Sequence, residues 1–576
     1  MTAAPGLHDV VLPAEGSGSD GGSPADYRAR HTVAHSLGDS LFVEAGAGSG
    51  KTSALVGRIV NLVVTGTCRM SELAAITFTE EAAAELRTRV RRGLEAVVAT
   101  AGLQYQAGLV ETALDEIDDA RISTIHGWCH RLLAEHPVEA GLPPRFEVLD
   151  EVGQSLAWRS QWSAALDRFG EDPGTMALFS LASALGLTPR HLSDLAAAAG
   201  RDWHRCGVDL PDVPAIVGAV AAASESASAA MLTSIGEATL MAGYCRTEND
   251  WLLRRVRQLE ELGSELAAAR TPEDRLALVA KAPRKMRTKV GRRENWECDV
   301  ELVRICVANA AESRDSLLSR AFDLVLPALV AIFDVLARDN AADRCRAGRV
   351  LFHDLLVLTR DMLRDRPAVL EQVRAGLRHL LVDEFQDTDP LQLEIVNLVA
   401  AEESGVAGGR LLVVGDPAQS IYRFRGADLE SYEAARNGFP SRGVVGLTSN
   451  FRSVPDILDF ANACFASLMP AYSLLSPERT SASDAPVVRL VGGPLDPALR
   501  RSEQRSGESQ AVAGMIERAV RTEGWLVEEA GTWRPARFSD VAILVPRRTG
   551  LAQIEAALDE LKIGYRVESA SLIYRS

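Results

Sequence analysis

The stretch Ala45-Gly46-Ala47-Gly48-Ser49-Gly50-Lys51-Thr52 decides the fold of this 576-residue chain. A β-branched and apolar run, Ser40 to Glu44, precedes it, and an amphipathic run from Lys51 to Val64 follows it. This order predicts a strand, a glycine-rich loop and a helix. Glycines let successive backbone N–H groups close around a phosphate at the N-terminus of a helix. We therefore expect a phosphate-binding loop here.

The residues of this loop suit the binding of ATP with Mg²⁺. All eight positions are predicted to line the nucleotide; Lys51 can reach the β- and γ-phosphates, and the Thr52 hydroxyl can hold the metal ion. Ala45 stands where the first glycine of the pattern is usual. The alternative is a glycine-rich turn with an incidental lysine. The strand and the helix on the required sides favour the nucleotide site.

A second element of the same chemistry lies far along the chain, where a hydrophobic strand ends in Leu381-Val382-Asp383-Glu384. Phosphoryl transfer needs metal-neutralised oxygens and a positioned nucleophile. Asp383 would hold Mg²⁺, and Glu384 would orient and deprotonate the attacking water. Alone, such an acidic pair would more often be a solvated turn. Together with the glycine loop, it predicts that Lys51, Asp383 and Glu384 are catalytic.

Composition narrows the class of protein. The chain has no run of about 18 uncharged apolar residues, and the stretch 1–26 lacks the basic start and apolar core of a signal peptide. We expect a soluble, cytoplasmic protein without a membrane partner. The eight cysteines are scattered without metal-site spacing, which predicts reduced, buried thiols. The formal charge of −16 does not exclude nucleic acid, because the local potential of a groove governs phosphate binding.

Continued as Phe385-Gln386-Asp387-Thr388, the acidic pair resembles the second motif of superfamily 1 helicases of the UvrD/RecB/AddA type. Other family motifs are similar to segments that follow in the expected order: 75–83 (A-I-T-F-T-E-E-A-A), 122–129 (I-S-T-I-H-G-W-C), 414–427 (V-G-D-P-A-Q-S-I-Y-R-F-R-G-A) and 447–453 (L-T-S-N-F-R-S). The resemblance covers about residues 28 to 576. It implies an ATP-dependent DNA helicase that acts in DNA repair or recombination.

Several side chains in these motifs suit single-stranded DNA. The rings of Tyr422 and Phe424 offer faces on which unpaired bases can stack, and such stacking contributes about 1–3 kcal/mol per base. The alternative is that either ring belongs to the hydrophobic core. Short hydroxyl and imidazole donors suit phosphate oxygens and position a strand without reading it, although a lone histidine is more often structural. The predicted DNA-binding residues are Thr77, Phe78, Thr79, His126, Tyr422 and Phe424.

Three further residues are predicted near the γ-phosphate or the base. Gln419 follows a strand that we expect beside the strand ending in Asp383-Glu384. There it can report hydrolysis, so we count it as a catalytic and coupling residue. Arg452 would reach the γ-phosphate from a second α/β domain, because arginine suits dispersed phosphoryl charge. A salt bridge at a helix start is the alternative. The ring of Phe451 could stack against adenine and so bind the nucleotide.

Three features depart from the family pattern. Arg30 falls where relatives usually carry a glutamine that reads adenine, which puts adenine selectivity in doubt. Glu81 stands where many members have lysine and, with Phe352-His353-Asp354-Leu355-Leu356, points to the RecB/AddA branch. The family's fifth and sixth motifs, including an arginine that completes the ATP site, and a RecB-type nuclease are not found before Ser576.

The expected fold is α/β, a P-loop NTPase with a RecA-like parallel sheet, a large helical insertion and part of a second RecA-like domain. Strands are also predicted at 73–78, 377–382, 410–414 and 541–545, helices at 80–94 and 551–561, and a loop at 476–486. The predicted divisions are a flexible N-terminus (1–26), the first ATPase domain (27–149 and 346–442), its helical insertion (150–345) and the start of an incomplete second domain (443–576).

The expected function is ATP-driven movement along single-stranded DNA, with single/double-strand junctions as a further substrate. The expected protein partner is a second helicase-nuclease subunit. The first alternative is an ATP- and DNA-binding fragment that needs the missing motifs or a partner, because loss of a finger-type arginine can cost about 10³ to 10⁵ in rate. The second is a P-loop protein without DNA contact. The basic segment Lys281 to Arg293 could meet duplex DNA or form a solvated helical face.

Overall fold

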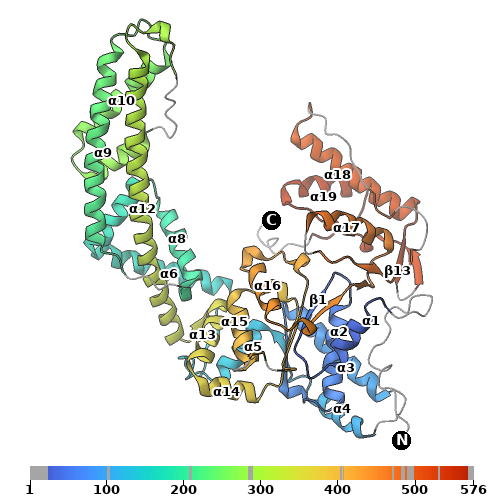
Figure 1. Cartoon of the computed structure of the whole chain (residues 1–576). Coiled ribbons are helices and arrows are strands. Elements are labelled where there is room, and N and C mark those ends of the chain that lie inside the picture. The colour runs from blue at the N-terminus through green and yellow to red at the C-terminus, as the bar shows by residue number, and fades with distance from the viewer. Residues whose placement is uncertain are drawn as a thin grey trace. The chain divides into compact units, whose positions relative to one another are not determined.

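The computed structural model describes most of the chain, which divides into two compact units (Figure 1). The first unit comprises residues 1–123, 376–390 and 400–576, and the second comprises 124–375 and 391–399. The described residues are 24–99, 104–205, 210–282, 290–402, 405–406, 408–469, 472–481, 487–489, 498–529 and 532–567.

The first unit is built on a six-stranded sheet in the order β10-β1-β9-β6-β2-β3. β1 pairs in parallel with β9 and β10, and β6 pairs in parallel with β2 and β9. Buried apolar residues fill most strand positions, as parallel sheets covered on both faces require. This confirms the predicted α/β class. The strands are β1 (Leu41–Ala45), β2 (Leu73–Thr77), β3 (Arg121–Thr124), β6 (His379–Val382), β9 (Leu411–Gly415) and β10 (Val444–Leu447).

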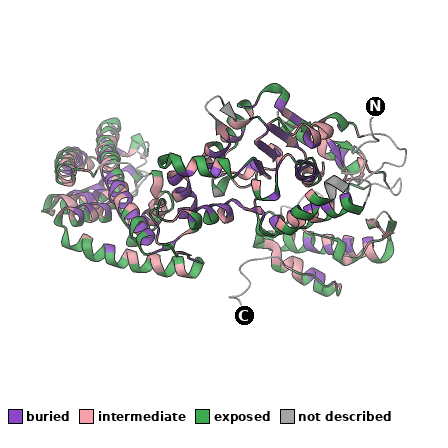
Figure 2. Cartoon of the chain, turned by 90° about the horizontal axis from the view of Figure 1, so that it is seen from below, coloured by how far each residue is buried: buried purple, intermediate pink, exposed green. Residues whose placement is uncertain are grey.

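Helices pack on this sheet and fix the loop that follows β1. The inner face of α2 buries Leu55, Ile59 and Leu62 in one core with strand residues such as Val43 and Leu412. Figure 2 shows buried residues on the sheet and on the inner helix faces, with exposed residues outside. The helices of this part are α1 (Tyr27–His35), α2 (Lys51–Val64), α3 (Glu80–Ala99), α4 (Gln104–Glu116) and α16 (Leu429–Asn437).

The sheet also corrects two predictions about the C-terminal part. Because β10 belongs to the first sheet, that sheet runs past the predicted boundary at 442. The predicted strand 541–545 is wrong: Leu544 is 93% exposed, and a strand forms only beside a neighbour. Among the described strands, nearby β13 (Leu526–Glu529) and β14 (Thr532–Pro535) pair only with each other. The helices here are α17 (Pro455–Leu468), α18 (Arg501–Glu517) and α19 (Leu551–Glu560).

The predicted loop at 476–486 is partly a strand. β12 (Ser476–Pro477) pairs in parallel with β11 (Ser449–Asn450), while 482–486 lie outside the described residues. The pairing places β11, just after β10, beside residues 27 positions later in the sequence. A Ser/Pro-rich composition is typical of loops. It does not exclude a strand of two residues, because so short a strand needs little apolar surface.

The second unit is helical between β4 (Glu147–Val148) and β5 (Arg349–Val350), which pair in parallel. The predicted insertion, 150–345, falls on these helices. Its core is formed by buried aliphatic residues and Phe333. The helices between the two strands are α6 (Glu151–Glu171), α7 (Pro173–Ala184), α8 (Pro189–Arg201), α9 (Val213–Ala242), α10 (Trp251–Ala268), α11 (Pro272–Lys281) and α12 (Val300–Arg346). Around them lie α5 (Ile125–Glu135), α13 (Phe352–Asp365), α14 (Pro367–Ala375) and α15 (Pro390–Ala400).

One helix of the described part, α9, is long and apolar enough to cross a membrane by length and composition. It lies beside α10 and α12 (Figure 1) and buries Val220, Met231 and Ile235 in the core of the helical unit. A core helix of this kind passes the same test of length and composition, so the feature is weak evidence for a membrane. The predicted cytoplasmic location stays a prediction.

Candidate functional site

The loop between β1 and α2 forms a close-fitting cradle. Gly48 and Gly50 have φ angles of 71° and 81°, which glycine adopts without steric cost. A Cβ added to Gly48 would lie 2.6 Å from Nδ2 of Asn450. Ala45 ends β1 opposite Leu447 in ordinary extended backbone, so alanine at the usual first-glycine position costs nothing. Gly50 caps the start of α2 without a side-chain hydrogen bond, and the first N–H groups of a helix have no partner within the helix, which is the arrangement that binds phosphate.

The segment after β10 packs directly on this loop. Asn450 Nδ2 donates to the Ala47 carbonyl at 2.5 Å, and the Phe451 amide donates to the Gly48 carbonyl at 2.9 Å. Asn450 Oδ1 in turn accepts the amide of Arg452 at 2.9 Å. Arg452 itself is exposed. The structure thus brings Phe451 and Arg452 to the glycine loop from within the same compact unit, whereas we expected Arg452 to come from a second domain.

Lys51 and Glu384, 333 residues apart, form an ion pair with Nζ and Oε2 3.0 Å apart. Glu384 has φ 49° and ψ 45°, a left-handed conformation that is strained for a residue other than glycine. The Gln386 side chain donates to the same carboxylate oxygen at 2.8 Å. Asp383, directly after β6, is fixed through its amide to the Ile76 carbonyl at 2.8 Å. Three predicted catalytic residues therefore meet at one place.

Two carboxyl groups beside Glu384 have raised pKa values. Burial first and the charge of Glu384 second raise the pKa of Asp383 to about 6, and the same two causes raise the pKa of Asp387 to about 6. A divalent cation would favour the charged form of such a group. The Thr52 hydroxyl and the Asp383 carboxylate are oxygen ligands of the kind that Mg²⁺ prefers.

The oxygen ligands available near Asp383 fit a metal ion that is bound partly by the protein and partly by the phosphates of a substrate. Within the described residues, no group of three or more His, Cys, Asp and Glu side chains could hold a metal ion. Mg²⁺ is commonly held by one or two protein oxygens together with substrate phosphates and water, and not by an all-protein cage. Thr52 and Asp383 could supply those protein oxygens.

A chain of hydrogen bonds leads from Glu384 to Gln419. Gln386, 2% exposed, accepts the Asp416 amide on Oε1 at 2.8 Å, and Asp416 Oδ2 accepts from Gln419 Nε2 at 2.6 Å. Ser420 Oγ also donates to the Gln386 carbonyl at 3.1 Å. Sequence reasoning assigned no role to Gln386 or Asp416. A glutamine two residues after the acidic pair was the available sign, because a polar amide that folding buries needs partners.

Three predicted DNA-binding aromatic residues lie in a row in the first unit. The ring centroids of Phe78 and Tyr422 are 4.8 Å apart, and those of Tyr422 and Phe424 are 5.8 Å apart. Phe424 is 80% exposed, which excludes the alternative that its ring is core. Thr77 is buried and donates to the Thr79 carbonyl, and the Thr79 hydroxyl accepts the amide of Ala82 at the start of α3. Their phosphate contacts stay predictions.

In the second unit, His126 lies against Phe352. Their ring centroids are 5.8 Å apart with the rings nearly perpendicular. His126 is the second residue of α5, whose first turn is capped by the Thr124 hydroxyl accepting the Gly127 amide at 3.1 Å. Phe352, the first residue of α13, is 58% exposed. The structure therefore places a second exposed aromatic group beside a residue predicted to contact DNA.

Asp354 has a structural role in the segment Phe352-His353-Asp354-Leu355-Leu356. Its carboxylate is completely buried and accepts hydrogen bonds from the guanidinium of Arg344, from Trp203 Nε1 and from the Leu351 amide at 3.0, 2.9 and 2.9 Å. These donors come from α12, from the short helix at 203–205 and from the residue before α13. One buried carboxylate therefore ties three elements of the helical unit together at the start of α13.

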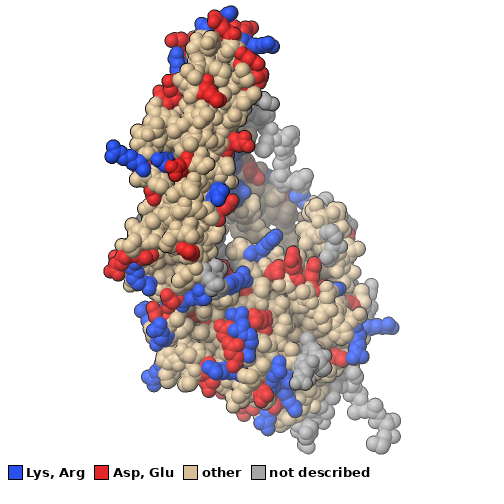
Figure 3. Space-filling model, turned by 60° about the vertical axis from the view of Figure 1, so that its left-hand side comes forward, with Lys and Arg blue, Asp and Glu red and all other residues tan. Residues whose placement is uncertain are grey.

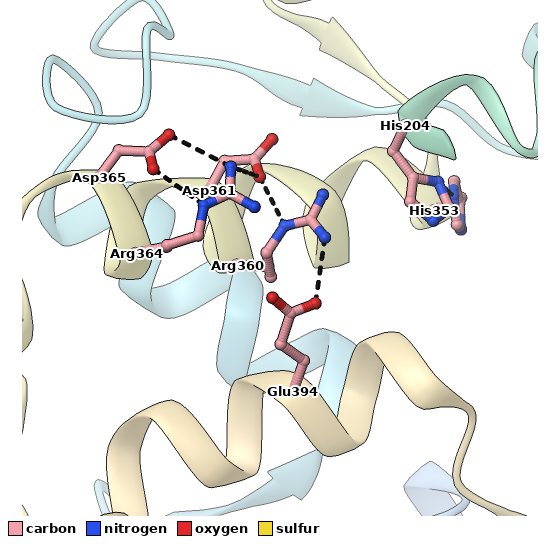
Figure 4. A network of polar contacts seen from close by, with 7 residues as sticks. All are labelled: His204, His353, Arg360, Asp361, Arg364, Asp365 and Glu394. Atoms are coloured by element: carbon pink, nitrogen blue, oxygen red, sulfur yellow. Dashed lines mark hydrogen bonds and ion pairs between the residues drawn. The ribbon is translucent and has the colours of Figure 1, made fainter. Parts of the chain in front are cut away.

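A histidine pair and an ion network continue along α13 (Figure 4). His353 Nε2 lies 3.0 Å from His204 Nδ1. About two turns further on, Arg360 pairs with Asp361 and with Glu394 of α15. One turn after that, Arg364 pairs with Asp361 and Asp365. The contacts to His204 and Glu394 join α13 to parts of the chain that are distant in sequence.

We expect the helical unit to lose stability as the pH falls from about 7 to about 4. Burial first, then His353, Arg205 and Arg360, lower the pKa of His204 to about 4, and Asp202 opposes them. The folded state thus binds fewer protons than the unfolded state below the ordinary histidine pKa, and its stability falls with pH. After allowance for solvent screening, the loss is on the order of 1–2 kcal/mol.

Urea unfolding at several pH values checks this prediction. His204→Gln should reduce the fall in unfolding free energy between pH 7 and pH 4, whereas the same change at exposed His130 should leave it as in the unaltered chain. An unchanged pH dependence in His204→Gln would show that the pair contributes nothing to it.

Charged side chains on the face shown in Figure 3 are intermixed, with Lys and Arg next to Asp and Glu. No single sign of charge dominates this face, so net charge alone does not mark a DNA path on it. Most of the basic segment predicted at Lys281 to Arg293 cannot be placed, since 283–289 lie outside the described residues. Its role stays a prediction.

The parallel sheet carries a glycine loop after β1, a lysine at the start of α2 and an acidic pair after β6, which is separated from β1 by β9. This arrangement defines a P-loop NTPase with a RecA-like domain. Residues 26–440 match the family described as the UvrD/REP helicase N-terminal domain. The chain therefore belongs to the UvrD/REP helicase family, as its motifs predicted.

Relatives support the same family at low identity. The chain is 28% identical over 518 residues to an ATP-dependent helicase/nuclease subunit of Moorella thermoacetica, covering 80% of this chain and 36% of that protein. It is 25% identical to the RecBCD enzyme subunit RecB of Escherichia coli, covering 90% and 47%, and 25% identical to DNA helicase II of the same organism, covering 74% and 38%. The chain thus spans less than half the length of these relatives.

Proposed function

We propose that this chain binds and hydrolyses Mg·ATP and couples hydrolysis to movement along single-stranded DNA, as part of a RecB/AddA-type helicase in DNA repair or recombination. The observation that carries the proposal is the path of contacts from Lys51 through Glu384, Gln386 and Asp416 to Gln419. This path ends three residues before Tyr422, the middle ring of the aromatic row. Nucleotide chemistry and base stacking are thereby joined within one compact unit.

The residues of the nucleotide site divide the chemistry among them. Lys51 exchanges its ion pair with Glu384 for the β- and γ-phosphates, which leaves the Glu384 carboxylate to accept a proton from the attacking water. Thr52 and Asp383 would hold Mg²⁺, which neutralises charge on the phosphate oxygens. Arg452, exposed beside the glycine loop, can approach the γ-phosphate.

Coupling follows from the position of Gln386. Its amide group donates to Glu384 and accepts from Asp416, so a change in the Glu384 partner alters the contacts of both neighbours. Asp416 holds Gln419, and the chain then runs into the loop that carries Tyr422 and Phe424. The affinity of the aromatic row for unpaired bases can therefore depend on the state of the nucleotide. Stacking of this kind is insensitive to sequence.

We propose partners on the same basis. Single-stranded DNA and single/double-strand junctions are the nucleic-acid substrates, and a second helicase-nuclease subunit is the protein partner. Supporting this are the names of two relatives, which describe a helicase/nuclease and a component of the RecBCD enzyme. The competing proposal is a chain that binds ATP and DNA but turns over only with groups supplied from elsewhere.

The test is ATP hydrolysis by this chain over a titration of single-stranded DNA, with Phe424→Ala as the informative variant. We expect DNA to stimulate turnover, and Phe424→Ala to raise the DNA concentration for half-stimulation by about 5- to 150-fold, because one stacked base contributes on the order of 1–3 kcal/mol. Nucleotide affinity should not change. Phe460→Ala, which removes a ring on α17 that is 57% exposed, is the matched control.

The outcomes separate the proposals. Equal effects of the two phenylalanine changes would remove the aromatic row as the DNA contact. Binding of ATP and DNA without turnover would favour the competing proposal of a binding-only chain. Turnover that DNA does not alter would contradict a coupled motor.

A further inference from the structure

Arg30, on α1, is held beside the glycine loop by a buried carboxylate. Its Nε donates to Asp26 Oδ1 at 2.7 Å and its Nη2 donates to Oδ2 at 2.9 Å, so the pair is bidentate. Asp26 Oδ2 also accepts the amides of Thr448 and Ser449 at 2.9 and 3.0 Å, and the Asp26 side chain is only 3% exposed. A carboxylate bound this completely fixes the plane of the guanidinium.

The same guanidinium contacts both the glycine loop and an aromatic ring. Nη2 lies 2.7 Å from the Ser49 carbonyl, and the guanidinium carbon lies 4.8 Å from the centroid of the Phe451 ring. Phe451 is itself fastened to the loop through its amide and the Gly48 carbonyl. A nucleotide whose phosphates occupy this loop is therefore flanked by Arg30 and Phe451. The guanidinium covers one face of the ring, which helps to hold it in place, and it supplies hydrogen-bond donors.

The outer amino group of Arg30 remains available for a ligand. Nη1 makes no hydrogen bond to any of the residues that the structure describes, and a Cβ added to Gly50 would lie 3.5 Å from it. The Arg30 side chain is 11% exposed. Its Nε and Nη2 groups are engaged with protein oxygens, whereas the two N–H bonds of Nη1 lie next to the phosphate loop at the start of α2.

The chemistry of arginine decides which base these donors suit. Arginine only donates hydrogen bonds. Guanine presents two acceptors, O6 and N7, on one edge, and the two N–H bonds of Nη1 can donate to them. Adenine presents N7 beside the N6 donor, a pair that an amide side chain matches better than a group that only donates. On the basis of the proposed nucleotide site, we infer that Arg30, positioned by Asp26, contacts the base and that this site accepts guanine nucleotides at least as well as adenine nucleotides.

Equilibrium binding of Mg·ATPγS and Mg·GTPγS to the full chain tests this inference. The unaltered chain should bind the GTP analogue within about threefold of the ATP analogue, or more tightly. Arg30→Gln, which introduces an amide in place of the guanidinium, should shift the ratio of the two dissociation constants toward ATP by about fivefold or more. The comparison of the two analogues uses only the unaltered chain, so it tests the inference whether or not the Arg30→Gln variant folds.

Asp26→Asn is the matched control for a purely structural role. It breaks the bidentate pair but keeps the donors of Arg30, so it should weaken both nucleotides together and leave their ratio unchanged. A preference for ATP clearly above threefold in the unaltered chain would overturn the inference. So would an Arg30→Gln variant that weakens both nucleotides equally, as a contact to phosphate or ribose would. Failure of both analogues to bind would overturn the proposed function as well.

Discussion

Glu384→Gln is expected to lower the rate of ATP hydrolysis by about 10²- to 10⁴-fold, the usual contribution of a positioned general base, while nucleotide binding becomes tighter. The loss follows because an amide cannot accept the proton of the attacking water. The gain in affinity follows because Lys51, now held by the Glu384 carboxylate at 3.0 Å, no longer has to give up an ion pair to reach the phosphates. The glutamine keeps the shape of the side chain.

Single-turnover hydrolysis and equilibrium binding of Mg·ATPγS measure the two effects separately. Asp387→Asn removes a neighbouring carboxylate that makes no ion pair with Lys51 among the described contacts, so it should leave nucleotide affinity nearly unchanged. Lys51→Ala should abolish binding of the nucleotide. If Glu384→Gln bound nucleotide more weakly than the unaltered chain, the ion pair would not be a contact that the nucleotide must displace.

Asp354→Ala is expected to destabilise the helical unit by about 3–5 kcal/mol, the usual cost of removing one partner of a buried ion pair. The change leaves the Arg344 guanidinium buried without its carboxylate and removes the acceptor of Trp203 Nε1 and of the Leu351 amide. These donors come from three separate elements. We therefore expect the backbone amides of α12, α13 and the short helix at 203–205 to lose protection from hydrogen exchange.

Amide hydrogen exchange resolved by segment is the suitable measurement, since a chain of two compact units need not unfold in a single step. Asp365→Ala removes an exposed carboxylate from the same helix and should leave exchange unchanged. Asp354→Asn should lie between the two, because the amide keeps one acceptor. Equal exchange in Asp354→Ala and Asp365→Ala would show that the buried pair is not what anchors α13.

The sequence by itself determined the elements that depend on local patterns. The strand, glycine loop and helix from Ser40 to Val64 could be predicted because positive-φ glycines and the change from strand to helix periodicity are encoded within a few residues. The Asp383-Glu384 pair could be predicted for the same reason. The order of the motifs then predicted the family, which the match over 26–440 confirms.

Only the tertiary structure decided which of these elements meet. The apolar run at 541–545 is typical of a strand, yet it pairs with no strand of the described part of the chain. β10 instead pairs in parallel with β1 and so joins the first sheet. The ion pair of Lys51 with Glu384 and the contact of Arg30 with the Phe451 ring each join residues that are hundreds of positions apart. Local sequence specifies periodicity and turn geometry, but hydrogen bonding and burial between distant segments depend on how the whole chain packs.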